Sequence, residues 1–317
     1  MYEKKIIIIS SVFLFIIFIF GILIGNYFYN LAINSKTDKS KIFNANHNLS
    51  EDYDEAKTSE IMDAYSILQK QEIYLSSFDN LKLHASFVKN EASDHKWVIL
   101  CHGYAGVNVI LSKVALKFYN INFNILIPDL RSFGKSEGNY LGMGWHDRLD
   151  IVSWIQKILE IDSAAQIVLY GQSMGGAAVM AASGENLPDN VKAIAEDSGY
   201  SSLWEEFSYQ LKELYGLPSF PFLNFASMMT SFKAQYNLKE VDLVKQVAKS
   251  KTPMLFIHGE KDTFVPMSHV EKVYEAANVP KEKLIVENAK HTRGIIADES
   301  LYWNTMEKFL QLYLRGI

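Results

Sequence analysis

The hydrophobic residues of this chain follow three patterns along its length. Residues 6–25 form an apolar run, IIIISSVFLFIIFIFGILIG, that contains no charged residue. A helix of this length rises about 30 Å, which matches the hydrocarbon core of a bilayer. The next stretch is polar without an apolar period, and short apolar runs then alternate with amphipathic ones. The first two patterns predict a transmembrane anchor over residues 1–30 and a flexible linker over residues 31–60.

The residues on either side of the apolar run indicate whether it is cleaved and how it is oriented in the membrane. A cleaved signal peptide has a shorter apolar run and small residues at its cleavage site, whereas Asn26 and Tyr27 follow this run directly. We therefore expect an uncleaved single-pass helix, with a cleaved signal and a buried core helix as the alternatives. Lys4 and Lys5 directly precede the run, which favours a cell-membrane protein with its body outside the cell.

The third pattern predicts one α/β domain over residues 61–317. Ile61, Tyr65 and Leu68 have helical spacing, and two alternating runs after them predict a β-hairpin. Apolar strands then alternate with helices, which predicts a mostly parallel, doubly wound sheet covered on both faces. We expect the hairpin at 72–77 and 81–88, strands at 97–101, 125–128, 167–170, 193–195, 254–258 and 284–287, and helices at 109–119, 145–159, 174–182, 268–277 and 300–314.

The strand expected at 167–170 leads into the motif GQSMGG and then into a helix. Such sheets present their chemistry at the carboxyl ends of their strands. Gly171 and Gly175 lack a Cβ, so strand and helix can approach each other around a strained turn that holds Ser173. The helix N-terminus adds backbone N–H groups beneath that side chain. The pattern predicts that Ser173 is a nucleophile, and the alternative is a helix N-cap.

Four further motifs follow other expected strands: HGY at 102–104, DLRSFGKSEG at 129–138, GEKD at 259–262 and NAKH at 288–291. With the serine motif, this ordered set resembles the serine-hydrolase branch of the α/β-hydrolase superfamily, which includes monoacylglycerol-lipase-like, Bem46-like and aminopeptidase-like enzymes. The resemblance covers about residues 72–317, and the anchor resembles those of membrane-held hydrolases of Gram-positive bacteria. It implies the α/β-hydrolase fold with a helical cap.

The resemblance also implies a catalytic triad, in which an acid and then a histidine follow the serine along the chain. Asp262 and His291 each lie after a strand, at the same sheet edge as Ser173. His291 would accept the serine proton, and Asp262 would orient the imidazole. Asp197, which follows the strand at 193–195, is the alternative acid.

Further roles follow from the same resemblance. The backbone N–H groups of Tyr104 and Met174 would form an oxyanion hole. His102 fits a loop-shaping hydrogen bond better than a catalytic role. The loop at 129–138 is mainly structural in the family, which implies scaffold roles for Asp129, Arg131 and Ser136.

The long segment between the strands at 193–195 and 254–258 is rich in aromatic residues and methionine. We expect it to form a cap over about residues 200–250, whose apolar side chains would line an apolar pocket. The alternative, favoured for most of them, is that they only pack the cap on the body. We therefore expect a carboxylesterase or lipase-like enzyme acting on a small-molecule or lipid-like ester. The alternatives are a peptidase or amidase, whose substrate amine would be held by Glu205, Glu206 or Glu213, and a non-catalytic binding protein on the same scaffold.

The composition of the chain limits the kinds of partner and cofactor that we expect. The net charge of −5 gives no indication of a phosphate-binding surface, so we do not expect nucleic acid as a partner, and 49% apolar residues exclude a disordered chain. Cys101 is the single cysteine, so no internal disulfide forms. The other histidines show no metal-ligand spacing, and we expect neither a metal nor a cofactor.

Overall fold

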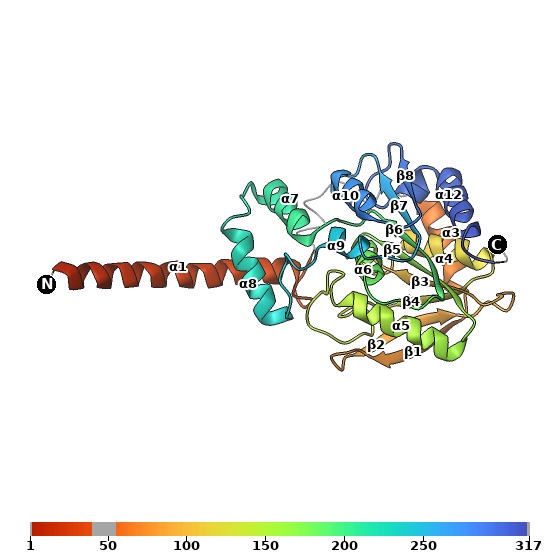
Figure 1. The fold of residues 1–317 in the computed structure, drawn as a ribbon, viewed down its shortest axis with the longest axis horizontal. Helices are drawn as coiled ribbons and strands as arrows, with labels where there is room; N and C mark the ends of the chain where they lie inside the picture. The colour runs from red at the N-terminus through yellow and green to blue at the C-terminus, as the bar shows by residue number, and fades with distance from the viewer. Residues whose placement is uncertain (1, 40–54, 316–317) are drawn as a thin grey trace.

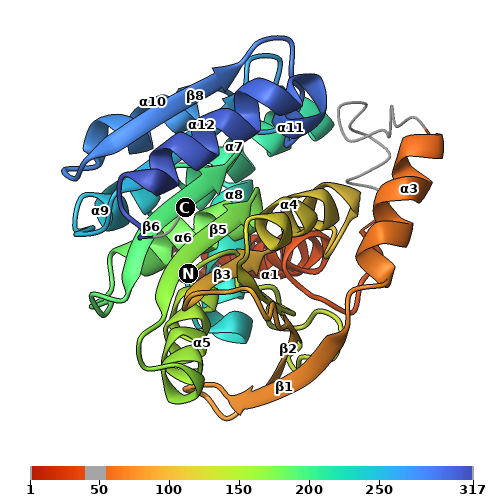
Figure 2. The same cartoon turned by 90° about the vertical axis from the view of Figure 1, so that its right-hand side faces the viewer.

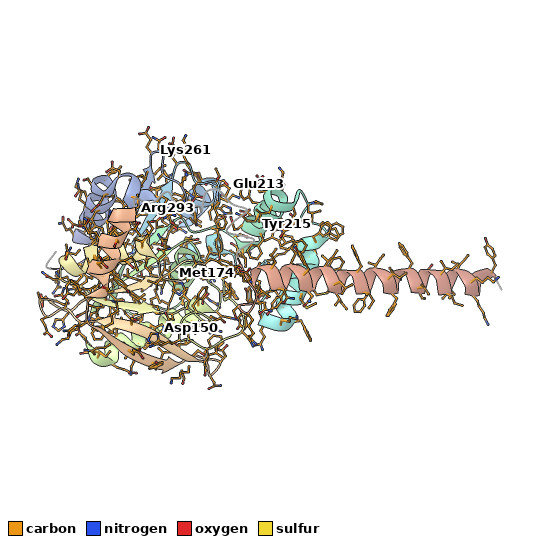
Figure 3. All side chains as sticks on the ribbon, turned by 180° about the vertical axis from the view of Figure 1, so that it is seen from behind. Asp150, Met174, Glu213, Tyr215, Lys261 and Arg293 are labelled. Atoms are coloured by element: carbon orange, nitrogen blue, oxygen red, sulfur yellow. The ribbon has the colours of Figure 1, made fainter. Side chains whose placement is uncertain are left out.

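A computed structural model describes residues 2–39 and 55–315 of the chain. The apolar N-terminal run lies in one long helix, α1 (Tyr2–Ala32), most of which extends away from the body (Figure 1). Figure 3 shows its side chains standing free along that length, and those of Ile6 and Phe20 are 51% and 55% exposed. Among the described residues, α1 is the one helix long and apolar enough to cross a membrane.

Eight strands form a single sheet in the order β1-β2-β4-β3-β5-β6-β7-β8, with β1 and β8 at its edges (Figure 2). Strand β2 is antiparallel to both of its neighbours, β1 and β4, and the remaining neighbours are parallel. The expected hairpin and mostly parallel sheet are therefore confirmed. The strands are β1 (Lys70–Ser76), β2 (Lys82–Val88), β3 (Lys96–Cys101), β4 (Asn124–Pro128), β5 (Gln166–Gln172), β6 (Val191–Asp197), β7 (Met254–Gly259) and β8 (Lys281–Val286).

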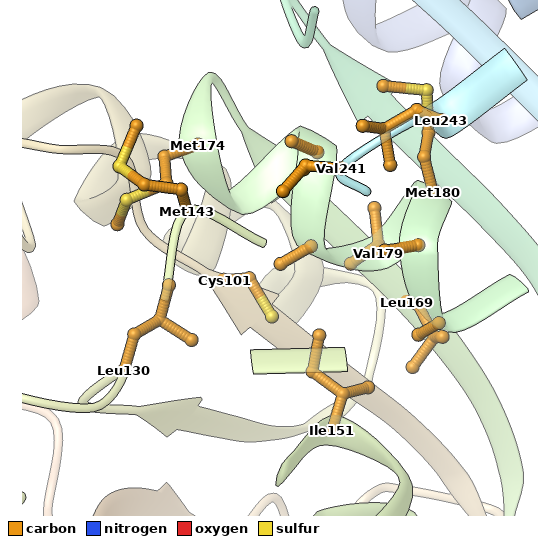
Figure 4. Close-up of a cluster of buried hydrophobic side chains, with 14 of the residues drawn as sticks. Cys101, Leu130, Met143, Ile151, Leu169, Met174, Val179, Met180, Val241 and Leu243 are labelled. Atoms are coloured by element: carbon orange, nitrogen blue, oxygen red, sulfur yellow. The ribbon is translucent and has the colours of Figure 1, made fainter. Parts of the chain in front are cut away.

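Helices cover both faces of this sheet, as the doubly wound pattern predicts. One face carries α3 (Glu55–Ser66), α4 (Val109–Asn120), the short α11 (Gly294–Ala297) and α12 (Glu299–Gln311). The other carries α5 (Asp147–Ile161), α6 (Met174–Ser183), α9 (Leu243–Val247) and α10 (Ser268–Ala276). Every residue of β3, β4 and β7 is buried, because a covered parallel sheet has no solvent face. Figure 4 shows part of the core, where Ile151, Leu169 and Val179 gather near Cys101.

Two helices that follow β6 in the chain and precede β7 form a separate layer. They lie in the segment for which we predict a cap. They are α7 (Leu203–Tyr215) and α8 (Phe222–Ala234), and α8 lies across α1 (Figure 1). The two backbones approach closely at glycines of α1, since a Cβ on Gly25 would come within 2.4 Å of the carbonyl oxygen of Phe225. A Cβ on Gly21 would come equally close to the Phe225 ring. The cap is therefore packed directly on the apolar helix.

The segment after α1 differs from the predicted flexible linker over residues 31–60. The carbonyl of Ile33 accepts the N–H of Leu141 at 2.8 Å, and Asn34 pairs with Tyr140 in an isolated bridge. The Nζ of Lys39 donates to the carbonyl of Leu31 at 2.8 Å, which satisfies part of the C-terminus of α1. The prediction is wrong for residues 31–39, because polar composition does not reveal these long-range backbone pairings. It also misses the start of α3 at residue 55, and residues 40–54 of the predicted linker lie outside the described residues.

Candidate active site

Ser173 occupies the sharp turn between β5 and α6. Its φ of 55° and ψ of −117° are unfavourable for a residue with a side chain, which costs about 1–3 kcal/mol. The two flanking glycines make the turn possible: a Cβ on Gly171 would lie 2.0 Å from the carbonyl oxygen of Gly175, and one on Gly175 would lie 2.1 Å from that of Cys101. The Ser173 amide donates to the carbonyl of Asp197 at 2.8 Å, which fixes the turn to β6.

The three residues predicted as a triad meet at this edge of the sheet. The Nε2 of His291 lies 2.9 Å from the Oγ of Ser173, and its Nδ1 lies 2.7 Å from the Oδ2 of Asp262. A proton on Nδ1 bonds the carboxylate, which leaves Nε2 free to accept the serine hydroxyl proton. All three side chains are buried. This geometry matches the predicted roles of a nucleophile, a general base and an orienting carboxylate, whose chemistry it would allow.

Further contacts fix the orientation of Asp262. Its Oδ1 accepts the backbone N–H groups of Phe264 and Val265, each at 2.9 Å. The Phe264 ring then lies against the imidazole of His291, with the ring centroids 4.9 Å apart. The loop after β7 therefore fixes the Asp262 carboxylate and, through Phe264, also contacts the imidazole of His291.

Asp197, the alternative acid, is engaged elsewhere. Its Oδ2 accepts the hydroxyls of Tyr302 at 2.8 Å and Tyr170 at 3.3 Å, and its Oδ1 accepts that of Ser198 at 2.8 Å. Burial raises the pKa of Asp197. Both of its oxygens are thus held by hydroxyl groups, and the acid that bonds His291 is Asp262.

The loop after β3 passes directly beside the serine. A Cβ on Gly103 would lie 3.3 Å from the Cβ of Ser173, so only a glycine allows this approach without displacement. Tyr104 follows in the chain, and its hydroxyl donates to the carbonyl of Ala32 in α1 at 2.8 Å. Met174 is the first residue of α6, and both Tyr104 and Met174 line the same cavity as Ser173. The two predicted oxyanion donors therefore flank the serine.

His102 connects two loops at this edge. Its Nε2 accepts the N–H of Leu130 at 3.1 Å, so Nδ1 carries the proton and donates to the carbonyl of Gly103 at 2.8 Å. Burial lowers the pKa of His102, which favours this neutral form. The geometry agrees with a loop-shaping role.

The loop at 129–138 contains a buried ion cluster. The guanidinium of Arg131 bonds both carboxylate oxygens of Asp150 at 2.8 Å, and it also bonds Asp79 at 2.9 Å. The Ser136 hydroxyl donates to the carbonyl of Asp129 at 2.6 Å. These contacts fasten the loop to the turn between β1 and β2 and to α5, as the predicted scaffold roles require.

A cavity of about 100 Å³ adjoins the serine. The body contributes Tyr104, Met143 and Met174, and the cap contributes much of the remaining wall. The sequence pattern does not predict the contribution of α1, which places three of its residues in this wall, with Ile33 directly after it. The residues that line the cavity from the two helical layers include Phe28, Leu31 and Ala32 of α1, the following Ile33, and Glu206, Phe207, Gln210, Leu211, Leu214, Tyr215, Leu223, Ala226 and Thr230 of the cap.

Glu206 is the one acidic residue among those that line this cavity. It is 3% exposed, its Oε1 accepts the amide of Gln210 at 2.9 Å, and its Oε2 lies 3.5 Å from the Nε2 of His269. Burial raises the pKa of Glu206 to about 8, so the carboxyl is neutral at pH 7. Glu205 instead bonds Lys272 near the surface.

Helical spacing separates Glu206 from Glu205 but not from Glu213, which lies seven residues later on the same side of α7. Glu206 follows the buried Leu203 by three residues and is itself buried, whereas Glu205 and Glu213 are exposed. The sequence pattern therefore does not mark Glu206 alone as the buried acid. Residues 2–39 and 55–315 contain no group of three His, Cys, Asp or Glu side chains that could hold a metal ion.

Comparison with known proteins adds the family. Residues 96–223 match the sequence model described as the alpha/beta hydrolase fold. YqkD, an uncharacterized protein of Bacillus subtilis, is 30% identical over 217 residues, which cover 67% of this chain and 70% of that protein. YNL320W, an uncharacterized membrane protein of Saccharomyces cerevisiae, is 26% identical over 243 residues, which cover 76% of this chain and 79% of that one. The Pyrococcus furiosus esterase Pf2001 has the same fold, with a TM-score of 0.64 at 22% identity over 83% of this chain and 95% of the esterase.

Proposed function

The chain belongs to the α/β-hydrolase fold family, and from this premise we propose that it is a serine hydrolase that cleaves carboxylic esters through an acyl-enzyme. The observation that carries the proposal is the continuous hydrogen-bonded chain from Ser173 through His291 to Asp262, at 2.9 and 2.7 Å. The strained serine turn adds to it, because such strain is maintained where a side chain must be presented for reaction.

In the first half of the reaction, the Oγ of Ser173 attacks the ester carbonyl carbon while Nε2 of His291 takes the hydroxyl proton. The carbonyl oxygen becomes an oxyanion facing the backbone N–H groups of Tyr104 and Met174. His291 then gives its proton to the departing alcohol, and the acyl group stays on Ser173. Asp262 holds the imidazole in the required tautomer and stabilises the imidazolium.

In the second half, water enters the position that the alcohol has left. His291 takes a proton from the water, and the resulting hydroxide attacks the acyl carbon. The second tetrahedral species collapses to a carboxylic acid, and His291 returns the proton to the Oγ of Ser173. No metal or cofactor takes part in this sequence.

The cavity wall supports an apolar acyl group as the part of the substrate that is recognised. Leucine, phenylalanine and methionine side chains surround the space beside Ser173, and apolar pockets favour apolar ligands. The peptidase alternative has one supporting observation, since Glu206 lines the same cavity as Ser173. Its pKa of about 8 leaves it neutral at pH 7, which is a poor partner for an ammonium group. We therefore place ester hydrolysis first.

We further propose that α1 crosses the cell membrane once and holds the catalytic domain outside the cell. The uncharged run at residues 6–25 and its exposed side chains support the crossing, and Lys4 and Lys5 support the orientation. In intact cells, added protease should then degrade the body of the full-length protein. Protection of the body until the cells are lysed would reverse the orientation.

The experiment that tests the activity uses full-length protein in phospholipid nanodiscs. A fluorophosphonate probe should label the wild type and not Ser173→Ala, because the probe reacts with an activated serine. The same two proteins are assayed with p-nitrophenyl esters and with aminoacyl-naphthylamides. Ester turnover that requires Ser173 supports the proposal, whereas turnover of the naphthylamides alone would favour the peptidase. Absence of both labelling and turnover would favour a binding protein.

A further inference from the structure

The end of α1 belongs to the catalytic cavity as well as to the anchor. We propose that the last two turns of α1 form a wall of the acyl-binding site, and that an ester whose acyl chain lies in the bilayer reaches Ser173 along the seam between α1 and the cap. This inference rests on the proposed ester hydrolysis and names the substrate class as membrane-embedded acyl esters.

The first step of the argument is that this wall is rigidly attached. Phe28 and Leu31 line the same cavity as Ser173. The helix end that carries them is bonded to the body twice, through the Tyr104 hydroxyl on the carbonyl of Ala32 and through the Leu141 amide on that of Ile33, both at 2.8 Å. Tyr104 is also a proposed oxyanion donor, so one residue contacts both the anchor and the proposed reaction centre.

The second step concerns depth. Helix α8 packs against Gly21 and Gly25, which lie inside the uncharged run at residues 6–25. If that run spans the hydrocarbon core, the cap lies at the membrane surface. From Gly25 to Ala32 the helix rises only about 10 Å, so the cavity begins next to the bilayer.

The third step concerns the outer face of the cap. Phe232 and Phe220 are 84% and 76% exposed, and Met228 is 47% exposed. Large exposed apolar side chains of this kind mark a contact surface, and on a helix beside a membrane they suit insertion among the lipid headgroups. The Nζ of Lys233 bonds the Oδ1 of Asn26 at 2.5 Å, which ties the end of α8 to α1.

The seam itself consists of aromatic rings. The ring of Phe28 lies between those of Tyr215 and Phe222, with centroid distances of 5.7 and 6.4 Å. Figure 3 shows Tyr215 close to the point where α1 enters the body. Tyr215 also shares a hydrogen bond with Tyr27 of α1, whereas Phe28 and Phe222 meet through their rings alone. An acyl chain that passes between Phe28 and Phe222 therefore separates no hydrogen bond and meets apolar surface.

The first arm of the test changes the size of the cavity at Leu31. Full-length Leu31→Trp in phosphatidylcholine nanodiscs should shift its chain-length preference toward shorter p-nitrophenyl esters, and Leu31→Ala toward longer ones. Each excluded methylene lowers kcat/KM about fourfold, so a loss of two lowers the octanoyl-to-acetyl ratio roughly fifteenfold. The matched control is Leu23→Trp, because Leu23 lies on the same helix and is 63% exposed. An unchanged ratio in both Leu31 variants, with melting temperatures near that of the wild type, would overturn the proposal.

The second arm tests the route. The fluorogenic ester 4-methylumbelliferyl oleate is placed either in the phosphatidylcholine vesicles that hold the enzyme or in separate vesicles of the same composition. We expect initial rates at least tenfold higher when enzyme and ester share a bilayer. Equal rates would show that the ester arrives through water and would overturn the membrane route. Failure of the proposed function is distinguishable, because the wild type would then cleave neither this ester nor p-nitrophenyl acetate.

Discussion

His291 and Asp262 meet through a 2.7 Å hydrogen bond between Nδ1 and Oδ2, although they follow different strands of the sheet. The parallel course of β7 and β8 brings the ends of both strands to one edge, and the two loops complete the contact. The orientation of the imidazole toward Ser173 therefore depends on a carboxylate supplied by the neighbouring strand.

The first prediction separates the two candidate acids. Asp262→Asn should lower kcat for a short ester by about 10⁴-fold, because an amide at this position favours the wrong imidazole tautomer. Asp197→Asn is the matched control, since Asp197 is buried and bonded to Tyr302. It should stay within about tenfold of the wild type, equivalent to about 1.4 kcal/mol. Both variants are assayed on p-nitrophenyl acetate, and the reverse ranking would reassign the acid.

The sequence predicts the sheet and the triad because both depend on local patterns. Each predicted parallel strand is a short apolar run, and each residue of the predicted triad follows within a few residues of such a run. Ser173 lies in a turn that Gly171 and Gly175, two residues away on either side, make possible, so its strained geometry can be inferred before any contact is known. The pairing of His291 with Asp262 then follows from the parallel order of the strands.

The role of the α1 end could not be predicted in the same way. Its attachment depends on the backbone of Ile33 meeting Leu141 and on the hydroxyl of Tyr104 meeting Ala32, far apart in the sequence. Backbone carbonyls are the same in every residue, so no side-chain pattern marks them. The polar residues after Ala32 resemble a linker for this reason, and the wall of the cavity is visible only in three dimensions.

The second prediction concerns Glu206 and pH. Its folded-state pKa of about 8 lies above the value near 4.3 of an unfolded chain, so the folded protein keeps a proton that the unfolded chain loses. The free energy of unfolding therefore falls as pH rises between these values, by a few kcal/mol. Glu206→Gln removes this loss of stability at high pH. The variant should therefore be more stable than the wild type at pH 8.5, and its gain in the free energy of unfolding should be larger there than at pH 5.

The measurement is thermal unfolding of full-length protein in nanodiscs at both pH values. Glu205→Gln serves as the control, because Glu205 precedes Glu206 in the same helix and bonds Lys272 near the surface. Its melting temperature relative to the wild type should show no such gain at high pH. If the melting temperature of Glu206→Gln relative to the wild type did not rise between pH 5 and 8.5, Glu206 would not be a buried neutral carboxyl.

The third prediction concerns the buried cluster around Arg131. Arg131→Met leaves Asp150 buried without its cation, which costs about 3–5 kcal/mol in the free energy of unfolding. The double variant Arg131→Met with Asp150→Leu should recover part of that loss, because the buried carboxylate is removed and the remaining Asp79 is partly exposed to solvent. Lys135→Met is the control, since its ion pair with Glu72 is exposed and such pairs contribute about 0–1 kcal/mol. Urea unfolding of all three variants gives the comparison, and equal losses for Arg131→Met and Lys135→Met would contradict the cluster's role.

The last prediction concerns the contact between α1 and the cap. A side chain at Gly25 would meet the carbonyl oxygen of Phe225, which belongs to a helix backbone and cannot rotate away. Gly25→Leu should therefore push α8 from α1 at a cost of about 1–3 kcal/mol. The cap should then open more often, and trypsin should cleave after Lys233 at least fivefold faster, since 1 kcal/mol corresponds to about that ratio.

Ser11→Leu is the control for this variant, because Ser11 is an exposed residue of α1 within the apolar run. Added bulk there meets lipid alone, so cleavage after Lys233 should match the wild type. Both proteins are digested in phosphatidylcholine nanodiscs, and the fragments are identified by mass. Wild-type cleavage rates in Gly25→Leu would mean that α8 does not rest on α1 in the bilayer. The route along the seam between α1 and the cap would then lose its basis, although Tyr104 and Leu141 would still hold the end of α1 at the cavity.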